Sequence, residues 1–290
     1  MIPSNFDYIA ALLKDRSGLI VTMDKLYLLD ARLSPIARRH GHANLDAVVA
    51  AMRAPFSESL IGEVVDAMTT NETSFFRDRT PFETLRTALI PGLVARRGAQ
   101  RAIRIWSAAC STGQEPYSLA MMLHDSFPAL RDWRIEIVAT DLSPTVLDRA
   151  RDGTFSAFEV QRGLPIQMLV RHFDQVDQSW RVKPELRKMI DFRICNLLGA
   201  FESLGRFDII LCRNVLIYFD QPTKAGVLNR LAKMINPDGA LMLGGAESVF
   251  GICNALQDVP GLRGVYGPSS PKPVARPAAA QPALTARIAS

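Results

Sequence analysis

The chain has 290 residues, of which 48% are hydrophobic and 22% charged, as is typical of a globular protein with a substantial core. No run of about eighteen uncharged apolar residues occurs, so no membrane insertion is predicted. The net charge of +5 includes three basic residues and no acid in the last 23 positions. The other 31 basic and 29 acidic residues nearly balance, which argues against a nucleic-acid partner.

The potential metal ligands are widely separated in the chain. The cysteines form no CxxC pair, so neither a disulfide framework nor a metal site is expected. The N-terminus lacks the features of a secretory signal, which together with the cysteine usage predicts a reduced, cytoplasmic location. The histidines also have no ligand spacing, and none is expected to be catalytic. These residues are Cys110, Cys195, Cys212, Cys253, His40, His42, His124 and His172.

Two patterns follow one another along the chain. Residues 1–75 have apolar residues at helical spacing, which predicts an all-helical domain, and residues 76–100 are expected to form a linker and a helix. In residues 101–267, short apolar runs alternate with helical segments, which is typical of buried parallel strands in an α/β fold. The predicted strands are Ile103–Ala109, Ile135–Thr140, Ile190–Cys195, Phe207–Cys212 and Ala240–Gly244.

Local signals divide this second region further. Ser143 and Pro144 form a good N-cap and first-turn pair, and a helix over Gln221–Ile235 is followed by a turn signal at Asn236–Gly239. Residues 153–188 interrupt the alternation and include a possible hairpin over Gln175–Val182. Residues 268–290 contain five prolines and few large apolar groups, so they are predicted to form a disordered tail.

Polar residues follow three of the predicted strands, where ligands bind in open α/β sheets. Asp141 follows the second strand and could accept hydrogen bonds from ribose hydroxyls, although it could equally be a helix N-terminal charge. Glu115 could pair with an ammonium group or simply be a first-turn acid, and Arg213-Asn214 could be a surface turn. The first loop has one glycine rather than GxGxxG, so a nucleoside carrying an amino acid fits better than a dinucleotide.

At these residues the chain resembles the chemotaxis receptor glutamate methyltransferase family. The similarity covers about residues 5–267, and the motifs occur in the order found in that family. They are Thr69–Asp78 (TTNETSFFRD), Trp106–Ser118 (WSAACSTGQEPYS), Ala139-Thr140-Asp141, Cys195–Leu198, Phe207–Phe219, Pro237-Asp238-Gly239 and Gly244–Ser248.

The resemblance implies a Rossmann-like class I methyltransferase domain with a small antiparallel β subdomain at 153–188, preceded by the helical domain. It implies that Asn71, Thr73 and Arg77 contact S-adenosylmethionine from the linker, while Glu115 and Asp141 hold its polar groups. Asn196 and Leu197 would flank the adenine, Arg213 and Asn214 would complete the pocket, and Arg77 and Tyr218 would orient the reacting groups. Alternatively, Arg77 could form a surface ion pair with Asp78 or Glu83.

The family's reaction is methyl transfer to glutamate carboxylates of methyl-accepting chemotaxis receptors, giving methyl esters and S-adenosylhomocysteine. A glutamate with a pKa near 4.3 is already ionised at neutral pH, so no general base and no metal are needed. Gln114 replaces a second glutamate found in many members, and no loss of activity is expected from this. The hairpin at Asp174–Gln178 looks shorter than in members that grip a receptor tether peptide, which suggests a peptide-independent monomer acting on the receptor's cytoplasmic helical bundle.

Two other functions are compatible with the sequence. The chain could methylate another substrate, such as a small molecule or RNA, or it could be a non-catalytic module that senses the cofactor. The near-neutral charge of the folded part argues against RNA. The presence of Asn71, Arg77, Glu115, Asp141 and Tyr218 argues against a module without activity.

Overall fold

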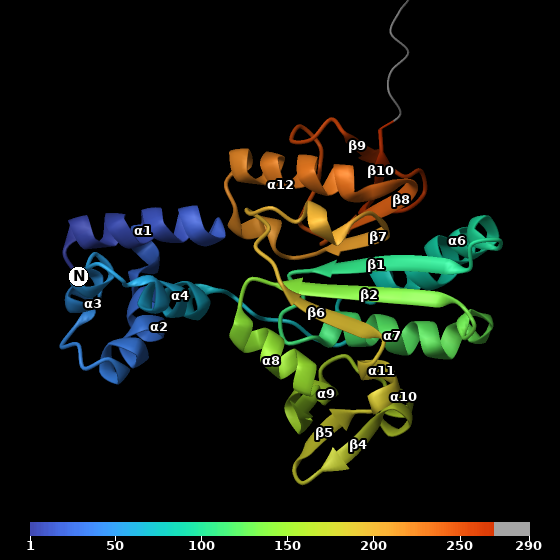
Figure 1. Ribbon diagram of the computed structural model, residues 1–290, viewed down its shortest axis with the longest axis horizontal. Helices are drawn as coiled ribbons and strands as arrows, with labels where there is room; N and C mark the ends of the chain where they lie inside the picture. The colour runs from blue at the N-terminus through green and yellow to red at the C-terminus, as the bar shows by residue number, and fades with distance from the viewer. Residues whose placement is uncertain (270–290) are drawn as a thin grey trace, which may run out of the picture.

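The computed structural model describes residues 1–269, so nearly all of the tail predicted at 268–290 lies outside the described residues. The chain begins with a helical domain that has its own apolar core, formed where the helices turn Leu13, Leu33, Val48 and Val64 toward one another. This domain is at the left of Figure 1. Its helices are α1 (Pro3–Ser17), η1 (Met23–Lys25), α2 (Leu26–Arg39), α3 (Leu45–Met52) and α4 (Glu58–Met68).

An irregular segment over residues 69–79 leads from the helical domain to the second domain. Phe75 of this segment is fully buried, and its ring lies edge-on to Phe155 and Phe173, with ring centres 5.0 and 5.7 Å away. A continuous helical stretch then runs from Thr80 to Arg97. Its parts are α5 (Thr80–Thr84), the π-helical η2 (Leu85–Leu89) and α6 (Ile90–Arg97).

A seven-stranded sheet forms the centre of the second domain, in the order β6-β2-β1-β7-β8-β10-β9. The first five strands in this order pair in parallel, and β10 pairs antiparallel with both β8 and β9. The strands are β1 (Ala102–Ala108), β2 (Arg134–Asp141), β6 (Ile190–Ile194), β7 (Phe207–Cys212), β8 (Ile235–Leu243), β9 (Leu256–Asp258) and β10 (Val265–Pro268).

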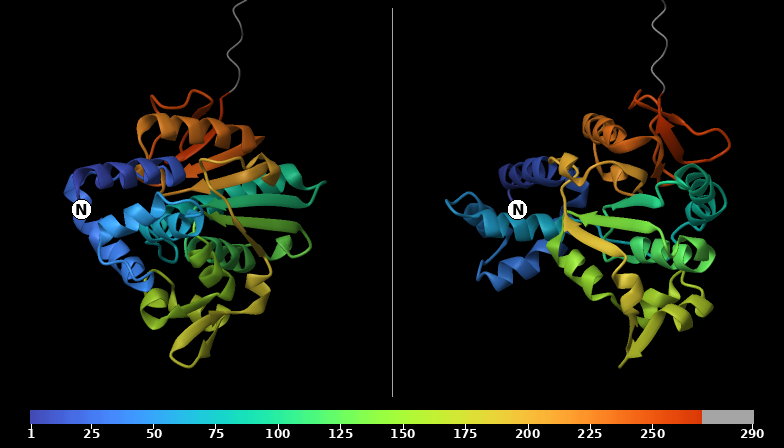
Figure 2. Two further views of the ribbon diagram at one scale, coloured as in Figure 1. Left: turned by 60° about the vertical axis from the view of Figure 1, so that its left-hand side comes forward. Right: turned by 45° about the vertical axis from the view of Figure 1, so that its right-hand side comes forward.

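Alternate residues of the sheet belong to two different cores. Ile105 of β1 packs with the core around α7, whereas its neighbour Trp106 packs with the core around α12. Helix α12 therefore lies on one face of the sheet, and α7 and α8 lie on the other (Figures 1 and 2). These helices are α7 (Gln114–Ser126), α8 (Pro144–Asp152) and α12 (Gln221–Met234), with short turns η3 (Pro128–Leu130), η4 (Glu202–Leu204) and η5 (Leu216–Tyr218).

The insertion after α8 forms a separate three-stranded antiparallel sheet in the order β3-β5-β4. The hairpin predicted over Gln175–Val182 corresponds to β4 and β5, which are joined by only two residues, Asp177 and Gln178. The prediction omitted the third strand and the helices. The complete set is β3 (Thr154–Ser156), α9 (Ala157–Gln161), α10 (Ile166–His172), β4 (Phe173–Val176), β5 (Ser179–Val182) and α11 (Pro184–Arg187).

Two further details differ from the sequence prediction. The segment Asn236–Gly239 is not a turn before the last strand but an irregularity within β8, where the pairing with β7 shifts its register. Gly239 is needed there because a Cβ atom would lie 2.7 Å from the backbone oxygen of Asp208. Strands β9 and β10 were not predicted, since three or four residues are too few to show a periodic pattern.

Candidate active site

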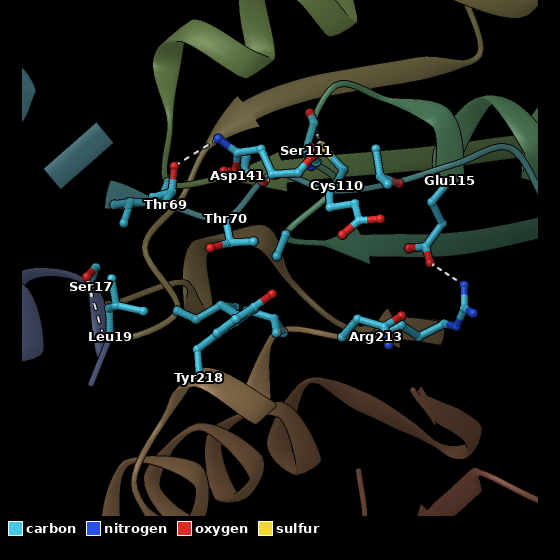
Figure 3. A pocket seen from close by; sticks show the side chains of 18 of the residues that line it. Ser17, Leu19, Thr69, Thr70, Cys110, Ser111, Glu115, Asp141, Arg213 and Tyr218 are labelled. Atoms are coloured by element: carbon cyan, nitrogen blue, oxygen red, sulfur yellow. Dashed lines mark hydrogen bonds and ion pairs between the residues drawn. The ribbon is translucent and has the colours of Figure 1, made fainter. Parts of the chain in front are cut away.

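A cavity of about 1000 Å³, counted out to the open solvent at its mouth, lies at the carboxyl ends of the parallel strands. Loops after β1, β2, β6 and β7 line it together with the 69–77 segment and the end of α1 (Figure 3). All ten residues predicted for the site lie on its wall. They are Asn71, Thr73, Arg77, Glu115, Asp141, Asn196, Leu197, Arg213, Asn214 and Tyr218.

Asp141 ends β2 and is fixed by two backbone donors. Its carboxylate accepts one hydrogen bond from the backbone N–H of Ser111 (2.8 Å) and another from that of Ser143 (3.0 Å). Burial raises the pKa of Asp141 above its ordinary value, while these N–H donors oppose that rise. The bond to Ser143 shows that Asp141 also serves the start of α8, while its oxygens keep capacity to accept further bonds from a ligand.

The loop after β1 is tightly folded. Ala109 and Ser111 both have φ above +50°, and Gly113 has φ +96°. Such conformations cost a non-glycine residue roughly 1–2 kcal/mol, so the surrounding contacts must compensate for them. At Gly113 a Cβ atom would also lie 3.0 Å from that of Ala150, so this position requires glycine. This loop brings the Ser111 N–H to Asp141 and the Ser111 hydroxyl to the backbone oxygen of Asn71 (2.7 Å).

Arg213 joins two acids across the cavity wall. Its guanidinium donates to Glu115 (2.8 Å) and to Asp78 (2.7 Å), and its side chain is almost completely buried. Glu115 also accepts a hydrogen bond from the Ser107 hydroxyl (2.8 Å). The group of two acids and one arginine is therefore net negative. Asp78 thus pairs with Arg213 and not with Arg77, and Glu83 pairs with Arg86 instead, so the alternative of a surface ion pair for Arg77 is wrong.

Arg77 and Tyr218 leave most of their polar capacity free. Within residues 1–269, the Arg77 guanidinium makes one hydrogen bond, to the backbone oxygen of Glu72 (2.9 Å), and the Tyr218 hydroxyl makes none. Tyr218 extends across the cavity from the side opposite Asp141 (Figure 3). Two buried polar atoms of the wall also lack a partner in this part of the chain, the Oδ1 of Asn214 and the Nε of Arg213.

The helical domain closes one side of the cavity. Ser17 and Leu19, at the end of α1, lie on its wall. The Asn196 side chain donates to the backbone oxygen of Arg16 (2.7 Å), and the Ile20 N–H donates to the backbone oxygen of Tyr218 (3.2 Å). Both contacts join the domains at the cavity, and sequence patterns within one domain could not reveal them.

Comparison with known proteins agrees with this arrangement. The family described as "CheR methyltransferase, all-alpha domain" matches residues 4–69, and "CheR methyltransferase, SAM binding domain" matches residues 71–265. The chain belongs to the CheR methyltransferase family. It is a methyltransferase with an N-terminal helical domain and an S-adenosylmethionine-binding domain, as the sequence predicted.

Its relatives are chemotaxis enzymes. The chain is 40% identical to "Chemotaxis protein methyltransferase Cher2" of Pseudomonas putida, over 88% of this chain and 94% of that protein. It is also 40% identical to "Chemotaxis protein methyltransferase 1" of Pseudomonas aeruginosa, over 88% and 94%. The protein with that same name in Vibrio cholerae is 39% identical, over 85% and 90%. No helix within residues 1–269 of the methyltransferase is long and apolar enough to cross a membrane.

Glu247 organises the loop after β7, although it does not line the cavity. One carboxylate oxygen accepts from the N–H groups of Asn214 (2.8 Å) and Gly244 (2.7 Å), and the other accepts from Val215 (2.9 Å) and Ile217 (3.3 Å). The loop that carries Asn214 and Tyr218 is therefore held by a residue about thirty positions later. Glu247 belongs to a quoted motif, but its role could not be read from the sequence.

Arg32 of α2 holds the start of the 69–77 segment by hydrogen bonds to backbone oxygens. Its guanidinium donates to the backbone oxygens of Met68 (2.7 Å) and Thr69 (3.0 Å), at the start of the segment that lines the cavity. Thr69 in turn accepts a hydrogen bond from the Asn71 side chain (2.9 Å). Arg32 is therefore a positioning residue for the segment that carries Asn71 and Thr73.

Among the described residues, the cavity has no histidine base and no readily ionised cysteine. No histidine lines it within the described residues, and its two cysteines are poor thiolates because burial raises the pKa of both Cys110 and Cys195. Its charged side chains are the acids Glu72, Glu115 and Asp141 and the arginines Arg77 and Arg213. The carboxylates can bind a cationic donor, and the arginines can position an anion.

Proposed function

We propose that this methyltransferase transfers a methyl group from S-adenosylmethionine to the side-chain carboxylate of glutamates on a methyl-accepting chemotaxis receptor. The products are glutamate methyl esters and S-adenosylhomocysteine. The observation that supports this most strongly is the composition of the cavity. It combines the buried Asp141 and the half-buried Glu115, which suit a cationic methyl donor, with Arg77, whose guanidinium makes a single hydrogen bond within residues 1–269.

The acids have separate proposed roles. Asp141 is held rigidly by two backbone N–H groups and would accept hydrogen bonds from both ribose hydroxyls. Glu115 would share its carboxylate between Arg213 and the ammonium group of the amino-acid part. Asn196 and Leu197 would flank the adenine, and Arg213 with Asn214 would complete the pocket.

The residues of the 69–77 segment would contact the reacting groups. Arg77 would steer the incoming carboxylate by charge-assisted hydrogen bonds, with Asn71 and Thr73 beside it. Tyr218 would orient the same carboxylate or form the wall around the methyl group. Within residues 1–269 the Arg77 guanidinium makes a single hydrogen bond, so its position can adjust. It could therefore orient the substrate carboxylate without binding it too tightly in the ground state.

The chemistry needs alignment and no proton transfer. When bound, S-adenosylmethionine supplies a methyl group activated by a sulfonium. A glutamate oxygen forms the new C–O bond while the C–S bond breaks, and the electron pair of that bond stays on sulfur. The carboxylate is already ionised because its pKa is about 4.3. Positioning of the reactants can lower the barrier by roughly 7–11 kcal/mol at best.

The shape of the β subdomain bears on the partner. Strands β4 and β5 are joined by only two residues, and this short connection supports a peptide-independent enzyme. We infer that the enzyme recognises the helical bundle of the receptor without a C-terminal tether peptide. It would act as a monomer in the cytoplasm, where that bundle lies.

Incubation with methyl-labelled S-adenosylmethionine and receptor-containing membranes tests this function. Label that mild base releases as methanol shows an ester, whereas base-stable label shows another substrate. Binding of the cofactor without label on any receptor would support the sensing module instead. Receptor variants that lack their C-terminal tether peptide should be methylated equally well. A loss of methylation in those variants would contradict independence from a tether.

A further inference from the structure

A second group of chemistry-bearing side chains lies outside the cavity. His124 and Asp125 are in the last turn of α7, and His172 is the last residue of α10, immediately before β4 in the β subdomain. Among the described residues these three bring potential ligand atoms within 4.8 Å of one another. None of them lines the cavity, and their separation in the chain hid the cluster from sequence analysis.

Two distances within the cluster are close to those between the ligands of one small cation, and the nitrogens of the two histidines lie within 4.8 Å of each other. The Oδ1 atom of Asp125 lies 3.0 Å from the Nε2 of His172 and 3.2 Å from the Nδ1 of His124. Ligands at about 2.0–2.1 Å from a tetrahedral zinc ion are roughly 3.3–3.4 Å apart. A small movement of the side chains would therefore give zinc geometry.

The Nε2 atom of His172 supplies a second, independent observation. The side chain of His172 is 2% exposed, and within residues 1–269 its Nε2 is without a hydrogen-bond partner, although the Oδ1 of Asp125 lies 3.0 Å away. Leaving a buried polar atom without a partner is energetically costly, because the atom has lost its hydrogen bond to water. A bound cation would remove this cost, since a neutral imidazole nitrogen is a good ligand for zinc.

The side chains around the cluster are compatible with metal binding. Arg171 pairs with the other carboxylate oxygen of Asp125 (3.2 Å), so Oδ1 stays directed at the two imidazoles. This is the outer-shell contact that commonly orients a ligating carboxylate. His124 is more than a third exposed, which gives the ion and a water ligand a path to the site.

We propose that His124, Asp125 and His172 form a binding site for a divalent transition-metal ion, with zinc as the best fit and water as the fourth ligand. Two ligands belong to the core helix α7 and one to the end of α10 in the β subdomain. The ion would therefore clamp this subdomain to the methyltransferase core. Its role is structural, because the site is separate from the cavity.

Metal titration of the full chain, after treatment with a chelator, tests this proposal. Zn²⁺ affinity is measured by competition with a metallochromic indicator, thermal unfolding is followed with and without Zn²⁺, and Co²⁺ serves as a spectroscopic probe. We expect one Zn²⁺ per chain, a higher unfolding temperature, and the intense visible bands of tetrahedral Co²⁺. A chain whose unfolding temperature is unchanged at saturating Zn²⁺ would overturn the proposal.

Matched variants assign the ligands. His124→Gln changes a partly exposed residue and should fold, and it should weaken Zn²⁺ binding at least tenfold. Asp125→Asn should do the same. His40→Gln is the control. His40 pairs with Glu63 (3.1 Å) in the helical domain, so its substitution should not change the Zn²⁺ affinity of the proposed site. Equal losses in His40→Gln and His124→Gln, or no loss in His124→Gln, would refute the assignment.

Discussion

Substitution of Glu247 by glutamine tests whether the loop after β7 is held from a distance. In the wild-type protein each carboxylate oxygen of Glu247 accepts two backbone N–H groups. A glutamine has the same shape but only one accepting oxygen, so its NH₂ group must face two donors. The glutamine would orient its NH₂ group toward the weaker pair, the N–H groups of Val215 and Ile217, because the Ile217 bond is already long at 3.3 Å.

The size of the effect follows from this count. A buried donor without a partner costs about 1–3 kcal/mol, and the Ile217 donor contributes little because it is exposed and its bond is long. We therefore expect the free energy of unfolding to fall by about 1–3 kcal/mol in Glu247→Gln. If the loop with Asn214 and Tyr218 loses its order locally, the affinity for S-adenosylhomocysteine should fall about tenfold for each 1.4 kcal/mol.

Urea unfolding and titration calorimetry with S-adenosylhomocysteine measure both quantities. Glu202→Gln is the matched control, since exposed Glu202 accepts a single backbone N–H, that of Phe201 (3.0 Å). It should change stability by less than about 0.5 kcal/mol and leave binding unaltered. Wild-type affinity in Glu247→Gln, or equal effects of the two substitutions, would show that the carboxylate does not position the loop.

Three other predictions concern the cavity. Asp141→Ala should weaken S-adenosylhomocysteine binding about 10- to 100-fold by calorimetry, because two hydrogen bonds to a charged group are lost, and normal binding would refute the pocket assignment. Arg77→Ala should lower kcat roughly 100-fold, with unfolding nearly unchanged because its one hydrogen bond is exposed; a large loss of stability would instead indicate a structural residue. The third prediction concerns pH. Burial raises the folded-state pKa of Asp141, so the folded chain binds more protons than the unfolded one between the ordinary and the raised pKa. The contribution of Asp141 to stability without cofactor should thus fall as pH rises through that window, whereas cofactor affinity, which needs the carboxylate, should rise. Denaturation and binding measured from acid to neutral pH should show opposite slopes that disappear in Asp141→Ala.

The strand-end residues could be predicted from sequence because the carboxyl ends of parallel strands meet at one edge of a sheet. Asp141 and Arg213 follow two apolar runs that are easily recognised, and the structure places both on one cavity wall. The role of Glu247 could not be predicted, because its partners are backbone N–H groups that any residue type could supply. Ser17 was missed for another reason, since its place on the wall depends on how two separate domains pack.

The β subdomain shows a similar limit. A hairpin over Gln175–Val182 was predicted, but β3 has only three residues and no readable pattern. Phe75 packs in the core against Phe155 and Phe173. The choice of these particular partners depends on tertiary packing, which sequence spacing does not specify.

A crystal structure with S-adenosylhomocysteine tests the central claim most directly. The ribose hydroxyls should lie within hydrogen-bond distance of Asp141 and the ammonium group beside Glu115, with the sulfur facing Arg77 and Tyr218. Density for the product elsewhere on the protein, or an Arg77 side chain directed away from the sulfur, would contradict the account.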